Sequence, residues 1–150
     1  PSRWHPALRN KSDSVLRALS ESGGMIGFSL YPHHLAEGSA CTLDNFCQMI
    51  ADTADDMGID HIGIGSDLCQ NQPDSVVEWM RNGRWTREKD FGEGSKASPG
   101  FPDQPTWFKD NRDFPSLRAG LKKVGLNDAA VNAVMGDNWL RFFEKSFGPA

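Results

Sequence analysis

Two short apolar segments with an amphipathic segment between them constrain the fold of this chain more than any other feature. The segments are GMIGFSLY at 24–31 and HIGIGSD at 61–67, and both are short and rich in apolar residues and glycine. Such segments are typical of buried strands. Between them, TLDNFCQMIADTADDMG at 42–58 has apolar residues at helical spacing and Thr42 as the predicted N-cap. A strand, a helix and a second strand in this order predict a parallel α/β unit.

Helical patterns lie on both sides of this unit. Each predicted helix combines an apolar stripe with a capping residue or a proline near its start. The chain is therefore predicted to be an α/β protein with few strands and several helices. The flanking helices, with the residues near their starts, are 12–22 (Ser12 or Asp13), 114–125 (Pro115) and 126–147 as one or two helices (Asn127).

The region 69–113 breaks the regular pattern. It is rich in Pro, Gly, Trp and charged residues, and only 74–83 has a helical pattern. Loops of such length are uncommon inside a compact domain and are usually functional or mobile. We therefore predict a long functional or mobile loop over 69–113.

Two predicted strands are too few to form a closed sheet. Each strand would keep an edge of unpaired backbone groups, which proteins ordinarily cover. The chain also opens with PSRWHPALRN, which has no start Met and reads like the middle of a loop. We therefore expect residues 1–150 to be part of a longer chain whose upstream segment supplies the missing strands.

Composition argues against several classes of partner. Lys and Arg number 16 against 20 Asp and Glu, the net charge is −4, and there is no basic stripe. This balance argues against nucleic acid and anionic membrane as partners, and the apolar runs are too short to span a bilayer. Because Cys41, Cys47 and Cys69 lack metal-type clustering, we expect them to be reduced thiols of a cytoplasmic protein.

The second predicted strand ends on a carboxylate. Gly63 and Gly65 remove side chains from one face of the strand before Asp67, which leaves room for a ligand or for another backbone. In α/β proteins, ligands bind at the carboxyl ends of parallel strands. A carboxylate there can bind a metal, orient a metal-bound water or accept its proton. An Asp at this position can also cap a following turn, so position alone leaves both roles open.

Four motifs follow one another along the chain: HPALRN at 5–10, SDSVLRALSESGGMIGFSLY at 12–31, HIGIGSD at 61–67 and MGDNWLRFFE at 135–144. Together they resemble the renal, or membrane, dipeptidases and their bacterial relatives. Each motif is weak alone, but their order and spacing are specific, and the resemblance runs through nearly the whole chain. The matching part is the C-terminal half of these zinc peptidases of the amidohydrolase type.

This resemblance implies a fold and an activity. The fold is a (β/α)8 barrel of the metal-dependent hydrolase kind, with residues 1–150 as the C-terminal half of one domain and loop 69–113 at its catalytic mouth. The activity is hydrolysis of dipeptides by a hydroxide that bridges two zinc ions. Asp67 corresponds to the family's strand-end aspartate, which passes a proton to the leaving amine. Arg9 corresponds to the arginine that holds the substrate's free carboxylate, a task that suits its planar fork.

The zinc ligands that the resemblance implies lie outside this chain. In relatives they are a His-x-Asp pair, a bridging Glu and two later histidines, the last of them expected just before Pro1. A histidine at that point favours the enzyme over a non-catalytic relative. None of His5, His33, His34 and His61 matches a family ligand, and we expect His61, at the start of its strand, to be structural.

The chain departs from the family pattern after Asp67. Relatives commonly continue as Asp-Phe-Asp-Gly, whereas Leu68, Cys69 and Gln70 follow here, so a second acid and a glycine are lost. This change lies at the substrate mouth and puts the substrate in doubt more than the chemistry. Cys69 has no identifiable His partner, so we expect a small buried thiol there and not a nucleophile.

Two alternatives to a dipeptidase stay open. One is another metal-dependent amidohydrolase that acts on a non-peptide amide or lactone. The other is a non-catalytic relative that binds small molecules or partners through exposed aromatic residues. The same aromatic residues also suit a lid or the interface of a homo-oligomer. The aromatic residues that we expect to be exposed are Trp79, Trp85, Trp107 and Phe108.

Overall fold

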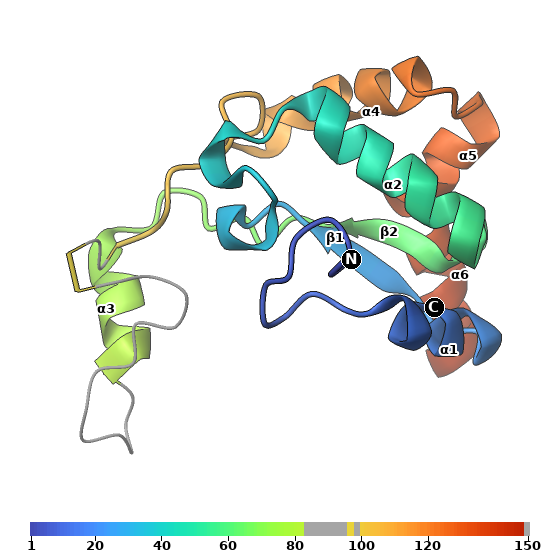
Figure 1. The fold of residues 1–150 in the computed structure, drawn as a ribbon, viewed down its shortest axis with the longest axis horizontal. Coiled ribbons are helices and arrows are strands. Elements are labelled where there is room, and N and C mark those ends of the chain that lie inside the picture. Colours follow the sequence, from blue (N-terminus) through green and yellow to red (C-terminus); the bar gives the residue numbers. More distant parts are fainter. Residues whose placement is uncertain (83–95, 98–99, 149–150) are drawn as a thin grey trace.

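A computed structural model describes residues 1–82, 96–97 and 100–148. In this part of the chain, the sheet consists of two parallel strands, β1 (Ile26–Ser29) and β2 (Ile62–Gly65). Figure 1 shows the two strands side by side, with helices packed around them. The predicted parallel pair is confirmed, and both strands are shorter than the apolar segments that predicted them.

The helix that connects the strands begins and ends as its sequence predicts. It is α2 (Leu43–Met57), and the Thr42 hydroxyl accepts a hydrogen bond from the backbone N–H of Asn45 at 3.1 Å. At the other end, Gly58 adopts a φ of +85°, which a residue with a side chain rarely adopts. This crossover sets Ile26 opposite Ile62, so the two strands start and end level with each other.

The other helices also begin near their predicted starts. Ser12, and not Asp13, caps the first helix by accepting from the N–H of Val15, and Asn127 accepts from the N–H of Ala130. A π-helical turn joins the last two helices. The helices are α1 (Asp13–Glu21), α3 (Asp74–Asn82), α4 (Phe114–Lys123), α5 (Asp128–Asn132) and α6 (Asn138–Phe147), with short turns η1 (Pro32–His34), η2 (Gly38–Ala40), η3 (Ile59–His61), η4 (Asn111–Asp113) and η5 (Ala133–Asp137).

The hydrophobic core lies between one face of the sheet, α2 and α4. Phe28 of β1 meets Phe46 of α2 edge to face, with ring centroids 6.5 Å apart. From α4, Leu117 and Leu121 are fully buried in the same cluster. Because burying one such side chain is worth ~1.5–3 kcal/mol, this cluster is the main source of stability for the unit that carries the strand ends.

Two aromatic residues that we predicted to be exposed belong to this core. Phe108 is fully buried, and Trp107 is half-buried and donates from Nε1 to the carbonyl oxygen of Cys41 at 2.7 Å. The prediction is wrong for both because their loop folds back over the start of α2, a contact that loop composition does not reveal. Trp79 is 75 % exposed, as expected, and Trp85 lies outside the described residues.

The opposite face of the sheet packs against the C-terminal helix. Side chains alternate along a strand, so Gly27 and Gly63 face away from Phe28. A Cβ on either glycine would lie within 3.2 Å of the Trp139 indole, so the ring of α6 fills the space that the glycines leave. Asn138, 1 % exposed, donates to two carbonyl oxygens beside the start of β2. The glycines are therefore needed for packing on this face.

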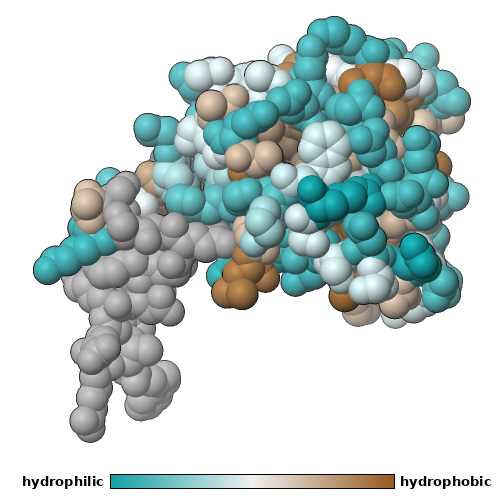
Figure 2. Space-filling view, in the orientation of Figure 1, coloured by the Kyte–Doolittle hydropathy of each residue, from teal (hydrophilic) through white to brown (hydrophobic). Residues whose placement is uncertain are grey.

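Helix α3 stands apart from the rest of the molecule. Figure 1 shows it beyond the ends of the two strands, at the left of the view. The surface that faces the viewer in Figure 2 is largely hydrophilic, with hydrophobic residues in small separate groups. Among the described residues, none of the helices combines the length and the apolar character that a membrane crossing requires.

Candidate functional site

The strand ends bring the segments after β1 and β2 to one edge of the sheet. Ser29 and Gly65, the last residues of the strands, are paired, and Asp67 follows two positions after Gly65. The side chain of Asp67 is exposed and makes no hydrogen bond or ion pair with the described part of the chain. Its backbone has a φ of +54°. That conformation is uncommon for residues other than Gly, although Asp tolerates it better than most, and such outliers cluster at functional sites.

The loop that carries Arg9 is closed at its base. The N–H of Ser2 donates to the carbonyl oxygen of Lys11 at 2.8 Å, so residues 2–11 form a compact loop with adjacent ends, as in an Ω-loop. Arg9 is exposed on this loop, and its guanidinium makes no hydrogen bond or ion pair with the described residues.

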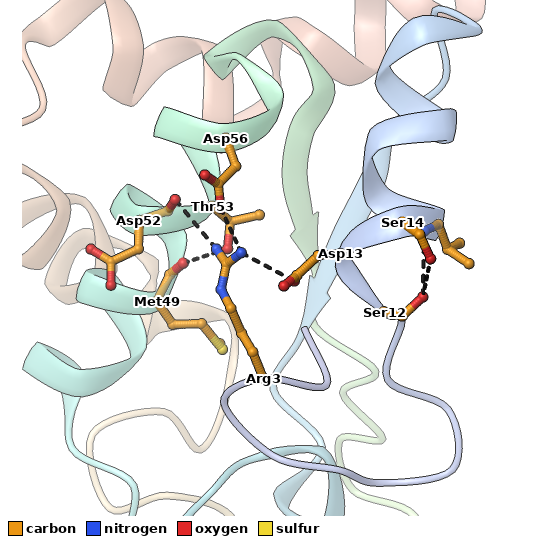
Figure 3. A network of polar contacts seen from close by, with 9 residues as sticks. Arg3, Ser12, Asp13, Ser14, Met49, Asp52, Thr53 and Asp56 are labelled. Carbon is orange, nitrogen blue, oxygen red and sulfur yellow. Dashed lines mark hydrogen bonds and ion pairs between the residues drawn. The ribbon is translucent and has the colours of Figure 1, made fainter.

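Arg3 anchors the base of this loop to two helices. Its guanidinium lies 3.1 Å from the Asp13 carboxylate of α1 and 2.5 Å from the Asp56 carboxylate of α2. It also donates to the carbonyl oxygen of Asp52 at 3.4 Å. Figure 3 shows the guanidinium between these groups. The acidic face of α2 thus holds the loop in place through the carboxylate of Asp56.

A second set of contacts holds the end of the loop that carries Arg9 to the end of β1. The Asn10 side-chain amide donates to the carbonyl oxygens of His5 at 2.8 Å and His34 at 2.9 Å. The His34 Nδ1 lies 3.0 Å from the Ser29 hydroxyl, which also accepts from the N–H of Tyr31. These contacts join the Arg9 loop, the segment after β1 and the last residue of β1.

A groove of about 370 Å³ runs between this loop and β1. Every residue from Met25 to Ser29 lines the groove, whereas one face of a strand would present only alternate residues. The groove therefore follows the edge of β1 that is not paired with β2. Arg9, Asn10 and Lys11 line the other side. Asp67 does not line the groove, so the structure does not place Arg9 and Asp67 in one pocket.

The histidines do not form a metal site in the described residues. His61 is structural, as predicted: its Nδ1 lies 2.8 Å from the carbonyl oxygen of Gly24 and ties the starts of the strands together. His33 lies with its ring 5.3 Å from that of Tyr31. No group of three or more His, Cys, Asp and Glu side chains within the described ranges could hold a metal ion.

The cysteines are all free thiols, and one of our predictions about them is wrong. Cys69 is exposed, not buried, because it lies beyond the strand in a segment that leaves the core. Cys41 and Cys47 are buried, and burial raises the pKa of the Cys41 thiol to about 11 and that of Cys47 to about 12. Neither buried thiol is poised to be a nucleophile.

Comparison with known proteins identifies the family. A family model described as membrane dipeptidase (Peptidase family M19) matches residues 1–79, which is more than half of the 150 residues. The chain belongs to this family. The matched segment contains both residues that the resemblance singled out, Arg9 and Asp67. No curated protein matched this chain.

Solved structures match nearly all of this dipeptidase-family chain. An amidohydrolase from Pseudomonas aeruginosa is 29 % identical with a TM-score of 0.83, over 99 % of this chain and 44 % of that one. The dipeptidase AC, a metallopeptidase of family M19, is 21 % identical with a TM-score of 0.66, over 94 % and 34 %. A metallopeptidase from Rhodobacter sphaeroides, with a phosphinate mimic of L-Ala-D-Ala, is 20 % identical with a TM-score of 0.65, over 93 % and 32 %.

The chain thus spans less than half the length of the solved structures that it matches. The two structures below 25 % identity show the fold alone. Residue-level reading of the sequence did not identify Asn10 or Arg3 as important, because their partners are backbone atoms and distant carboxylates. The only signal in the sequence was the position of Asn10 directly after Arg9 in HPALRN.

Proposed function

We propose that this chain is the C-terminal half of a zinc-dependent dipeptidase, in which Asp67 moves a proton and Arg9 holds the free carboxylate of the substrate. The single observation that carries the proposal is Asp67 itself. Within a family of dipeptidases, it is an exposed, unengaged carboxylate in a left-handed backbone conformation at the carboxyl edge of parallel strands. That edge is where α/β enzymes place their reacting groups.

Asp67 suits a role in proton transfer. In amide hydrolysis the attacking water must lose a proton and the leaving amine must gain one, and one carboxylate can accept the first and donate the second. Because the described residues leave both carboxylate oxygens of Asp67 without a partner, the group can approach a substrate without first breaking a contact.

Arg9 suits recognition of a carboxylate. Its guanidinium is exposed beside the groove and is not neutralised by an ion pair within the described ranges. A planar guanidinium can donate two parallel hydrogen bonds to a carboxylate, which gives direction as well as charge. Every dipeptide has a free carboxylate beside its scissile bond, so a site for that carboxylate fits this class of substrate.

The described residues do not by themselves fit a zinc centre, because none of their His, Cys, Asp and Glu side chains form a suitable group. We therefore propose that the ligands of the two zinc ions come from outside residues 1–150. We likewise propose that the α/β unit is half of one (β/α)8 barrel domain, with region 69–113 at its mouth and the edge of β1 paired to a neighbouring strand. A cytoplasmic location, expected from the cysteines, and a homo-oligomeric state, expected from the aromatic residues, are further proposals.

A second candidate function is hydrolysis of a non-peptide amide. It is favoured by the 29 % identical structure, which is named an amidohydrolase, and by the residues Leu68, Cys69 and Gln70 that replace the common family pattern after Asp67. A panel of dipeptides, N-acyl amino acids and lactones, assayed with the complete zinc-loaded protein, separates the two. Preference for dipeptides supports the first proposal, and turnover confined to the other amides or lactones supports the second.

The proton-transfer role is tested by Asp67→Asn in the complete protein. We expect zinc content to stay near the wild-type value and kcat on a dipeptide to fall by ~10²–10⁴, the range for general acid–base catalysis. Asp55→Asn, which changes an exposed carboxylate on α2, is the matched control and should keep wild-type kcat. Wild-type kcat in Asp67→Asn across the pH range would refute the role.

The carboxylate role is tested by comparing a dipeptide with its C-terminal amide. We expect Arg9→Met to raise KM for the dipeptide by about ten- to a hundredfold, as a charge-assisted contact of ~1.5–3 kcal/mol is lost, and to leave KM for the amide unchanged. The KM of Arg9→Lys for the dipeptide should fall between those of wild type and Arg9→Met. Arg17→Met, an exposed arginine of α1, is the control. Equal discrimination against the amide by wild type and Arg9→Met would show that Arg9 does not bind the carboxylate.

A further inference from the structure

We propose that Asn10 is a positioning residue that fixes Arg9 against the end of β1 and thereby sets recognition of the substrate carboxylate. The inference rests on the proposed function of Arg9 and goes beyond it, because it assigns the geometry of that contact to a different side chain. Asn10 itself would touch neither the substrate nor a metal.

The side chains of Arg9 and Asn10 have different surroundings. Arg9 is exposed and without a partner among the described residues, whereas Asn10 is half-buried and uses both hydrogens of its amide. One hydrogen goes to the carbonyl oxygen of His5 inside the loop, and the other goes to the carbonyl oxygen of His34 across the groove edge. A single side chain therefore braces the loop internally and ties it to the segment after β1.

The far end of this tie is itself fixed to the sheet. The His34 ring lies 3.0 Å from the Ser29 hydroxyl, and Ser29 is the last residue of β1, paired with Gly65. The path from the strand end to Arg9 thus runs through Ser29, His34 and Asn10. It is independent of the Arg3 anchor, which holds only the base of the loop.

The tie matters because a bidentate contact tolerates little displacement. Binding groups must stay within about half an ångström of the productive geometry, and long side chains on loops meet this demand only where their backbone is held. Without the Asn10 bonds, Arg9 keeps its charge and exposure, but its end of the loop loses the hydrogen bonds to His5 and to the segment after β1. The predicted defect is therefore loose recognition of the carboxylate, with catalysis otherwise intact.

The test uses Asn10→Asp in the complete zinc-loaded enzyme, because aspartate keeps the shape and removes both donors. Asn10→Ala removes the donors without adding a charge and carries the same test should the Asp variant fold poorly. We expect KM for a dipeptide to rise by about tenfold, the effect of losing one or two ordinary hydrogen bonds. We expect kcat, zinc content and KM for the C-terminal amide to change by less than about twofold.

A double-variant comparison separates this inference from the proposed function. The quantity compared is discrimination, meaning the preference for a dipeptide over its C-terminal amide. If Asn10 acts through Arg9, Asn10→Ala should not reduce this discrimination further when it is added to Arg9→Met. Unchanged discrimination in Arg9→Met alone would defeat the carboxylate role and this inference with it. Reduced discrimination in Arg9→Met, with wild-type discrimination in both Asn10 variants, would overturn only the inference. Equal losses of activity on the dipeptide and the amide in the Asn10 variants would also overturn the inference, because they would show a merely structural role. Asn132→Ala, which changes an exposed asparagine in α5, is the control for the substitution.

Discussion

Substituting Gly63 by Ala tests the packing of the C-terminal helix on the sheet. A Cβ at Gly63 would lie 2.2 Å from Nε1 of Trp139 and 2.7 Å from Cε2, well inside contact distance. The indole cannot rotate away freely, because its Nε1 donates to the carbonyl oxygen of Ile64 at 3.1 Å and its rings pack against Phe142 and Phe143. Overpacking costs ~1–3 kcal/mol, and loss of the indole hydrogen bond adds ~1 kcal/mol. We therefore expect Gly63→Ala to lower the free energy of unfolding by about 2–4 kcal/mol.

The same strand provides a matched control for this substitution. At Gly65, on the same face, a Cβ would meet its nearest neighbours at 3.5 Å, an ordinary contact. Gly65→Ala should be neutral or stabilise by up to ~1 kcal/mol, because Gly has more conformational freedom to lose on folding. Urea unfolding followed by circular dichroism measures the stability of both variants. The urea midpoint of Gly63→Ala should lie about 1–2 M below that of wild type, for an m-value near 2 kcal/mol/M. Equal midpoints for the two variants would refute the packing argument, whereas recovery of stability in Gly63→Ala with Trp139→Phe would support it.

Three further predictions concern Asn138 and the cysteines. Asn138→Ala should lower the free energy of unfolding by ~2–4 kcal/mol in the same urea assay, because two hydrogen bonds of 2.7 Å are lost and the two carbonyl oxygens that accept them stay buried. A loss below ~1 kcal/mol would contradict this prediction. At pH 8, iodoacetamide should modify Cys69 rapidly and spare Cys41 and Cys47, as peptide mass spectrometry can show, and equal labelling of all three would contradict the burial. Because burial raises the pKa values of Cys41 and Cys47 to about 11 and 12, above the ~8.5 of an unfolded thiol, their contribution to stability is present below about pH 8.5 and is lost as the pH rises toward 11 to 12.

Local features of the fold could be predicted from the sequence because their causes are local. Ser12, Thr42 and Asn127 cap helices through hydrogen bonds to N–H groups three residues later, and a side chain needs only its own neighbours to do so. The strand pair followed from apolar runs that flank one helix. In contrast, burial of Trp107 and Phe108 depends on a loop that returns to α2 from a distant part of the chain, and composition cannot show that return.

The candidate site shows the same division. That Asp67 closely follows a strand could be read from the alternation in HIGIGSD, but its role rests on the family resemblance, because an Asp after a strand can also be a turn cap. Arg9 carried no signal of its own outside that resemblance. The contacts that hold its loop join residues such as Asn10 and His34, which are far apart in the sequence, so only the structure reveals them.

Many of the long-range ties in this molecule connect a side-chain donor to a backbone carbonyl. Asn10, His61, Trp107, Asn138 and Trp139 all hold distant segments in this way. A carbonyl oxygen is present whatever side chain its residue carries. The residue at an acceptor position can therefore be substituted without loss of the hydrogen bond, whereas the donor residue cannot. Among divergent relatives, we therefore expect the donor side chains to be conserved and the residues that supply the carbonyl oxygens to vary. Methods that detect contacts from paired substitutions should therefore miss the contacts that fix the strand ends.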